Sequence, residues 1–372
     1  MSDQAFDAGA RPPRRWRLVL PLALVVALAL GWSAFWLYAQ ARARTALAAW
    51  TKHEAAAGRV LSCATQGFGG FPFRFELGCV APELALTRAH VSFKARDLHA
   101  AVQIYQPSLA IAEFGGPLTV ADDAGHAATM DWALAQASVH GLPTMPPQRI
   151  SFVLDRPSIA RDGGQEMLAR AAHAEFHVRP APRQPQDPPA FDLALYLTQA
   201  VLPGVPRVPA TPIDAQIAAT LRGLGDFSPR PLPQMLRDLQ AANGQLEVTQ
   251  TRIQQGNVLA VGRGTLHLTA RGTLDGDMEI TVAGIEDLIT ALGIDRAVGQ
   301  ASQNALNRLA PGLDLNRLLG SRGNSALAAM GASVLGRPTQ LEGRQAVALP
   351  LRFADGTVFL GPLKVGQIAP LF

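Results

Sequence analysis

The 372-residue sequence is poor in lysine and cysteine and lacks the motifs of the common enzyme classes. It has two cysteines, and its lysines are Lys52, Lys94 and Lys364. No lysine follows a glycine, so there is no phosphate-binding P-loop, and no His-Glu-x-x-His metal motif occurs. The arginines are scattered and, beyond residues 11–17, form no basic run interleaved with aromatic residues. We therefore expect no nucleic-acid partner.

Two short stretches come close to catalytic motifs without completing them. Residues 262–264 (Gly-Arg-Gly) begin like a dinucleotide-binding fingerprint, but His267 stands where the third glycine belongs. Residues 331–335 (Gly-Ala-Ser-Val-Leu) resemble a nucleophile elbow, but Leu335 replaces its final glycine. The sequence therefore predicts a protein that is not an enzyme, with no catalytic residues and no cofactor.

Only one long apolar run is present, at residues 18–38, and it contains no charged residue. A helix needs about 20 such residues to cross a bilayer. Trp32, Trp36 and Tyr38 lie at its end, where aromatic rings prefer the membrane interface. A cleaved signal peptide is the alternative, but its apolar region is normally only ~7–15 residues long. We favour a cytoplasmic tail at 1–17, a single transmembrane helix at 18–38 and a helical stalk at 39–57.

The two cysteines indicate the compartment. Residues 67–72 have strong turn chemistry, and apolar residues then alternate with polar ones up to Cys79. A hairpin folded about residue 71 would place Cys63 opposite Cys79 and favour a cross-strand disulfide worth ~3 kcal/mol. Such a bond indicates an oxidising compartment, and thus a body in the bacterial periplasm. Two buried free thiols are the alternative, whereas a zinc site lacks further ligands.

Beyond residue 58 the hydrophobic period changes from helical to alternating. Strand-like stretches separated by turns predict a mainly β (α+β) body with a long curved antiparallel sheet, since no βαβ alternation is present. One predicted strand passes through Met130, Trp132 and Leu134. We expect a first β unit at 58–178, a proline-rich connection at 179–190 and a second β unit at 191–372. A helical patch is predicted near residues 285–335.

Two clusters are candidate sites. His173, Glu175 and His177 would share one face of a strand, where three such ligands could hold zinc, but a solvated polar face explains them fully and we expect no metal there. Phe71, Phe73 and Phe75 follow the glycine-rich turn. They could form an aromatic lip for lipid acyl chains or a partner, or belong to a tight turn that leads into a core strand.

Two segments carry a family resemblance. The stretch from Trp50 to Cys79, with Glu54, Gly58-Arg59, Cys63 and GGFPFRFELGC, resembles the start of the domain-of-unknown-function 2125 family. The final stretch, LPLRFADGTVFLGPLKVGQIAPLF, resembles that family's C-terminal end. This resemblance covers about residues 40–372. It implies a single-anchor envelope protein of alphaproteobacteria and brings no catalytic residues.

A second resemblance concerns residues 244–283, with GQLEV and GRGTLHLTARGTLDGDMEI. This stretch is similar to AsmA-like envelope proteins, which are anchored in the inner membrane and implicated in lipid traffic. Together these patterns predict a membrane protein whose curved sheet offers an apolar groove to lipid or to another envelope component. The alternatives are a scaffold that binds envelope proteins through sheet edges or the helical patch, and a hydrolase with an unfamiliar site.

Overall fold

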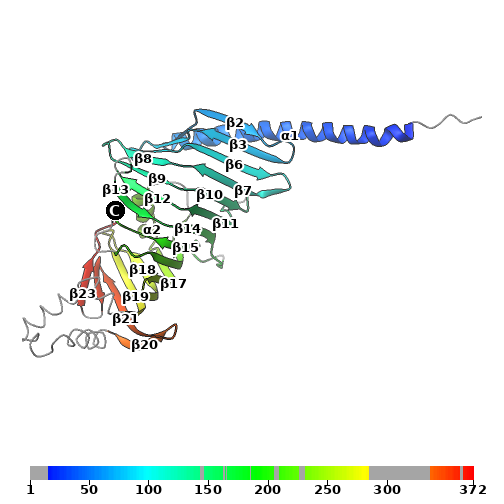
Figure 1. Cartoon of the computed structure of the whole chain (residues 1–372). Helices are drawn as coiled ribbons and strands as arrows, with labels where there is room; N and C mark the ends of the chain where they lie inside the picture. The colour runs from blue at the N-terminus through cyan, green and yellow to red at the C-terminus, as the bar shows by residue number, and fades with distance from the viewer. Residues whose placement is uncertain are drawn as a thin grey trace, which may run out of the picture.

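The computed structural model describes residues 16–142, 146–161, 164, 166–184, 186–204, 209–225, 231–284, 336–360 and 363–372. These residues form a long N-terminal helix, one short helix and two antiparallel sheets of 7 and 16 strands (Figure 1). The large antiparallel sheets confirm the predicted mainly β class. The helical patch predicted at 285–335 lies outside the described residues.

Helix α1 (Trp16–Ala56) is continuous and contains both the predicted span and the predicted stalk. It is long and apolar enough to cross a membrane, as expected for a single-pass anchor. Pro21 lies in its second turn, where it removes one backbone hydrogen-bond donor from the helix. In Figure 1 the N-terminal part of α1 extends well past the sheets.

Two sheets make up the body, and all their strand pairs are antiparallel. The small sheet consists, in spatial order, of β1 (Arg59–Ser62), β4 (Glu83–Leu86), β5 (Val91–Lys94), β8 (Leu118–Asp122), β9 (Ala127–Asp131), β12 (Ser158–Arg161) and β13 (Glu166–Arg170). The large sheet begins with β2 (Thr65–Gly69), β3 (Arg74–Val80), β6 (Asp97–Gln103), β7 (Gln106–Gly115), β10 (Leu134–His140), β11 (Arg149–Asp155) and β14 (His173–Pro180). It continues with β15 (Ala190–Ala200), β16 (Ile213–Arg222), β17 (Gln245–Gln255), β18 (Val258–Leu268), β19 (Leu274–Ala283), β21 (Arg344–Ala354), β22 (Thr357–Leu360) and β23 (Leu363–Gln367), while β20 (Arg337–Leu341) pairs with β21.

The chain passes between the sheets through two-residue corners. Residues 81–82, 116–117 and 156–157 are three of them, and the second residue of each is a proline. Proline has no N–H for the ladder, so it ends one strand and allows the next to begin in the other sheet. A further corner, at 132–133, corrects the strand predicted through Met130 and Leu134: these residues belong to β9 and β10 in different sheets.

The described core is small and lies towards the C-terminal part of the large sheet. Helix α2 (Leu232–Ala241) places Leu239 on Leu221, Leu224 and Leu268. A second cluster forms around Val282 and Leu349. Our sequence analysis missed α2, although Met235, Leu236 and Leu239 have helical spacing and a proline precedes them.

The proline-rich stretch connects two paired strands. β14 ends at Pro180, β15 begins at Ala190, and the two pair directly. The large sheet therefore continues directly from β14 to β15. The division of the body into two β units stays a prediction.

Candidate functional site

One face of the large sheet is apolar across successive strands. Because each strand pair has a defined register, side chains can be followed from strand to strand in rows. The first row consists of Leu77, Ala100, Ala112, Ala137, Phe152, Phe176, Leu195 and Ile217. The next row consists of Phe75, Val102, Ala110, Val139, Ile150, Val178, Leu193, Ala219 and Val248. We call the surface formed by these two rows the apolar face.

The opposite face of the same strands is largely polar. One of its rows consists of His99, Glu113, Gln136, Val153, Glu175, Tyr196, Gln216 and Arg252. Gln136 Nε2 donates a 3.0 Å hydrogen bond to Glu113 Oε1 along this row. The alternation of side chains along each strand thus sorts the sheet into one polar and one apolar side.

The two helices in the described part of the chain, α1 and α2, lie at the two flanks of the apolar face. At one flank, Trp36 of α1 stacks on Phe75, and the Arg44 guanidinium of α1 lies over the Phe68 ring at 4.9 Å. At the other flank, α2 packs on Leu193 and Leu246. Between these flanks lie β6, β7, β10, β11 and β14.

Among the residues that the structure describes, no complete second layer covers these five strands. Only Ala135 and Val178 among their residues are buried, and β11 has no buried residue although it has a partner strand on each side. An internal strand beneath a packed layer would bury every second side chain. Within the described residues, the apolar face is therefore partly accessible between α1 and α2.

The small sheet repeats this pattern on a smaller scale. One of its rows consists of Leu61, Leu84, Phe93, Val120 and Ala128. All five side chains are half-buried rather than buried. Both sheets thus carry an apolar row that packing within the described residues leaves partly open.

The structure separates the three phenylalanines of the predicted aromatic lip. Phe71 meets the edge of the Trp36 ring at 5.4 Å, and Phe75 stacks on the same ring at 5.8 Å. Phe73 is 64% exposed, and Phe71 is 55% exposed despite its contact with Trp36. Phe71 and Phe75 therefore dock the β2–β3 hairpin on α1, while Phe73 and part of the Phe71 ring are left accessible.

Cys63 and Cys79 form the predicted disulfide, with their Cα atoms 5.5 Å apart. The expected cross-strand register is wrong, because Cys79 lies opposite Gln66 in the β2–β3 pair. Cys63 instead occupies the corner between β1 and β2, where the Ala64 N–H donates to the Val80 carbonyl. The bond therefore ties the junction of the two sheets to β3.

On the polar face, four side chains form a hydrogen-bonded chain. His173 Nδ1 lies 2.6 Å from Asp155 Oδ1, and His173 Nε2 lies 2.7 Å from Glu175 Oε1. His177 Nε2 lies 2.8 Å from Glu175 Oε2. The two imidazoles thus converge on the carboxylate of Glu175 rather than on an open position. Among the described residues, no group of three or more His, Cys, Asp or Glu side chains is arranged to hold a metal ion.

The charges in this chain follow from its geometry. An ionised carboxylate only accepts hydrogen bonds, so His173 must carry a proton on both ring nitrogens to satisfy both neighbours. Hydrogen bonds to Glu175 and then to Asp155 accordingly raise the pKa of His173. Hydrogen bonds from His173 and then from His177 lower the pKa of Glu175. Both shifts favour the charged pair.

We expect the stability of the body to depend on pH through His173. A raised pKa in the folded state means that protonated His173 stabilises the fold fully below its unfolded pKa of about 6.5. This stabilisation is lost as the pH rises through the folded value. His173→Gln should remove that loss and flatten the curve of unfolding free energy against pH above about 6.5. Urea unfolding at a series of pH values above about 6.5 measures this pH dependence. The substitution His99→Gln, at an exposed histidine, is the control. A variant curve as steep as that of the wild type would contradict the expectation.

A family comparison assigns the chain. Residues 36–369 match the family described as an uncharacterized protein conserved in bacteria, DUF2125. The chain belongs to this family. The similarity to AsmA-like envelope proteins stays a prediction. No curated protein matches the chain.

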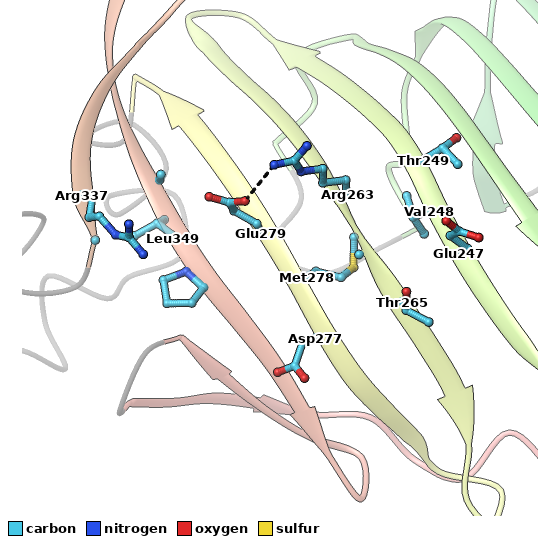
Figure 2. Close-up of a pocket in the computed structure, with 14 residues that line it drawn as sticks. Glu247, Val248, Thr249, Arg263, Thr265, Asp277, Met278, Glu279, Arg337 and Leu349 are labelled. Atoms are coloured by element: carbon cyan, nitrogen blue, oxygen red, sulfur yellow. Dashed lines mark ion pairs between the residues drawn. The ribbon is translucent and has the colours of Figure 1, made fainter.

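This DUF2125 chain also has a hollow of about 920 Å³ beside β17, β18, β19 and β21 (Figure 2). Its lining combines charged residues with Val248, Met278 and Leu349. Arg263 and Glu279 pair across it at 3.5 Å, and both side chains are exposed. Its lining also includes the hydroxyls of Thr249 and Thr265 and the carboxylate of Asp277.

A second hollow, of about 610 Å³, lies on the polar face of this DUF2125 protein. Glu175 and His177 line it, together with Arg149 and Arg179. Arg179 is paired with Asp192 at 3.1 Å, so this cation is already neutralised by its neighbour.

Proposed function

We propose that this protein is a membrane-anchored, non-enzymatic envelope protein that holds lipid acyl chains against its apolar face. The observation that carries the proposal is the open stretch of this face over β6, β7, β10, β11 and β14. Phe176 is exposed and most other side chains of this stretch are half-buried, and contiguous accessible apolar surface on a protein is typical of a binding site. Burying acyl methylene groups on it would gain ~0.8 kcal/mol each.

The dimensions suit an acyl chain. One leaflet contributes about half of a hydrocarbon core that is roughly 30 Å thick, which is ~15 Å per chain. The seven residues of β11 extend over ~24 Å at about 3.4 Å per residue. An acyl chain lying along a strand would therefore fit within the apolar face.

The proposed location is the periplasmic side of the inner membrane, with the N-terminus in the cytoplasm. Four arginines in residues 11–17 support this orientation, because cytoplasmic flanks are rich in basic residues. The disulfide supports an oxidising compartment for the body. Anchoring next to the bilayer would keep the apolar face close to a source of lipid.

A matched pair of aromatic residues tests the proposal. Phe176 is 40% exposed on the apolar face, and Tyr196 is 41% exposed on the polar face of the neighbouring strand. Each is replaced in turn by the photo-cross-linker p-benzoylphenylalanine in the full chain. After irradiation of cell membranes, mass spectrometry of the purified protein should find a phospholipid or fatty-acid adduct at position 176 and none at 196.

Other adducts would count against lipid binding. A stoichiometric protein adduct at position 176 would favour the scaffold alternative. Equal lipid labelling at 176 and 196 would indicate non-specific contact with lipid and would contradict binding by the apolar face.

A further inference from the structure

The β2–β3 turn lies against the part of α1 that belongs to the membrane span. Trp32 Nε1 donates a 2.9 Å hydrogen bond to the carbonyl oxygen of Pro72, and Trp36 Nε1 donates at 3.2 Å to that of Arg74. The Trp36 side chain is only 6% exposed because Phe71 and Phe75 pack on it. The turn therefore sits beside residues 32–36 and not beside the stalk.

The position of Trp32 gives the depth of the turn. Trp32 precedes Tyr38, the last residue of the uncharged run, by about 9 Å at ~1.5 Å of helix rise per residue. The interfacial layer on each side of the hydrocarbon core is about 5–8 Å thick. If α1 spans the bilayer with Tyr38 at the aqueous edge of the interfacial layer, the turn consequently lies about at the inner boundary of that layer.

The side chains that the turn leaves free suit this layer. Phe73 is 64% exposed, and Tyr105 in the adjacent β6–β7 turn is 73% exposed. The two turns are joined, since the Ile104 N–H donates to the Phe73 carbonyl at 2.9 Å. Aromatic side chains are enriched at this level of membrane proteins.

The distribution of charged residues agrees with a bilayer as the surface that the two turns contact. Residues 66–75 and 98–112, which contain these two turns, include no aspartate or glutamate. The β8–β9 turn of the small sheet, beyond the corners, carries Asp122 and Asp123. A bilayer that contains phosphatidylglycerol has an anionic surface, so a carboxylate-free end is the end that it repels least.

We propose that the β2–β3 and β6–β7 turns insert Phe73 and Tyr105 into the body-side interface of the bilayer that α1 spans. This contact fixes the body in one orientation beside its anchor, with the large sheet starting at the membrane. It goes beyond the proposed function and does not require the apolar face to bind lipid.

Photo-cross-linking of the full chain in phosphatidylethanolamine–phosphatidylglycerol nanodiscs tests the contact. p-Benzoylphenylalanine replaces Phe73, with two controls. Phe35 on the outer surface of α1 is 51% exposed and serves as the lipid-facing control. Val80, at the other end of β3, is 55% exposed and serves as the solvent-facing control. Phospholipid adducts at 73 and 35, with none at 80, are the expected result.

Two outcomes would overturn this inference. One is the absence of a lipid adduct at position 73 while position 35 is labelled normally. The other is a protein adduct at 73, with a second copy of the chain or another protein, in place of lipid. Neither outcome bears on position 176, so failure here leaves the test of acyl binding intact.

Discussion

Replacing both cysteines by alanine should lower the free energy of unfolding of the body by ~3 kcal/mol. The Cys63–Cys79 bond closes a loop across a sequence separation of 16, and its removal frees the unfolded chain. Because Cys63 lies at the corner between β1 and β2, the first strands of both sheets should loosen together. Urea unfolding of Cys63→Ala/Cys79→Ala beside the wild type measures the difference.

Reduction of the wild type provides the control, since it breaks the same bond without changing the packing. A reductant should shift the unfolding midpoint of the wild type towards that of the variant and leave the variant unchanged. In cells, the wild-type thiols should resist maleimide labelling until a reductant is added. Free thiols in the native protein would contradict both the bond and the periplasmic location of the body.

Trp36→Ala should release the β2–β3 hairpin from α1. Replacing a buried tryptophan by alanine costs about 3–5 kcal/mol. Here the substitution removes the ring contacts with Phe71 and Phe75 and the hydrogen bond to the Arg74 carbonyl. Since α1 stays apolar, the loss should appear as local opening rather than as expulsion from the membrane. Hydrogen exchange of residues 66–80 in nanodiscs should accelerate.

Two variants separate the parts of this contact. Trp36→Phe keeps an aromatic ring and loses the donor, so only about 1 kcal/mol should be lost. Trp32→Ala removes a half-exposed ring with one hydrogen bond to Pro72 and should have a smaller effect than Trp36→Ala. Unchanged exchange in Trp36→Ala would show that the hairpin is held elsewhere.

The sequence by itself determined much of this protein. A long uncharged run of apolar residues avoids water either in a membrane or in a buried core. Helix α1 could therefore be predicted from composition and length. Period-two alternation fixes which side chains share a face, and it therefore determined both the β class and the apolar side of β11 and β14. The pairing of Cys63 with Cys79 followed because no third cysteine competes.

The tertiary structure alone decided where strands change sheets and what covers them. Local alternation continues through Trp132, whereas the corner there depends on its Nε1 donating to the Phe114 carbonyl, 18 residues away. Cys63 likewise left the expected register because the chain crosses between sheets at that point. Whether an apolar row is buried depends on what lies above it, and α1 and α2 reach only its flanks. Alternation marks a face as apolar, but it carries no information about the distance to the next layer.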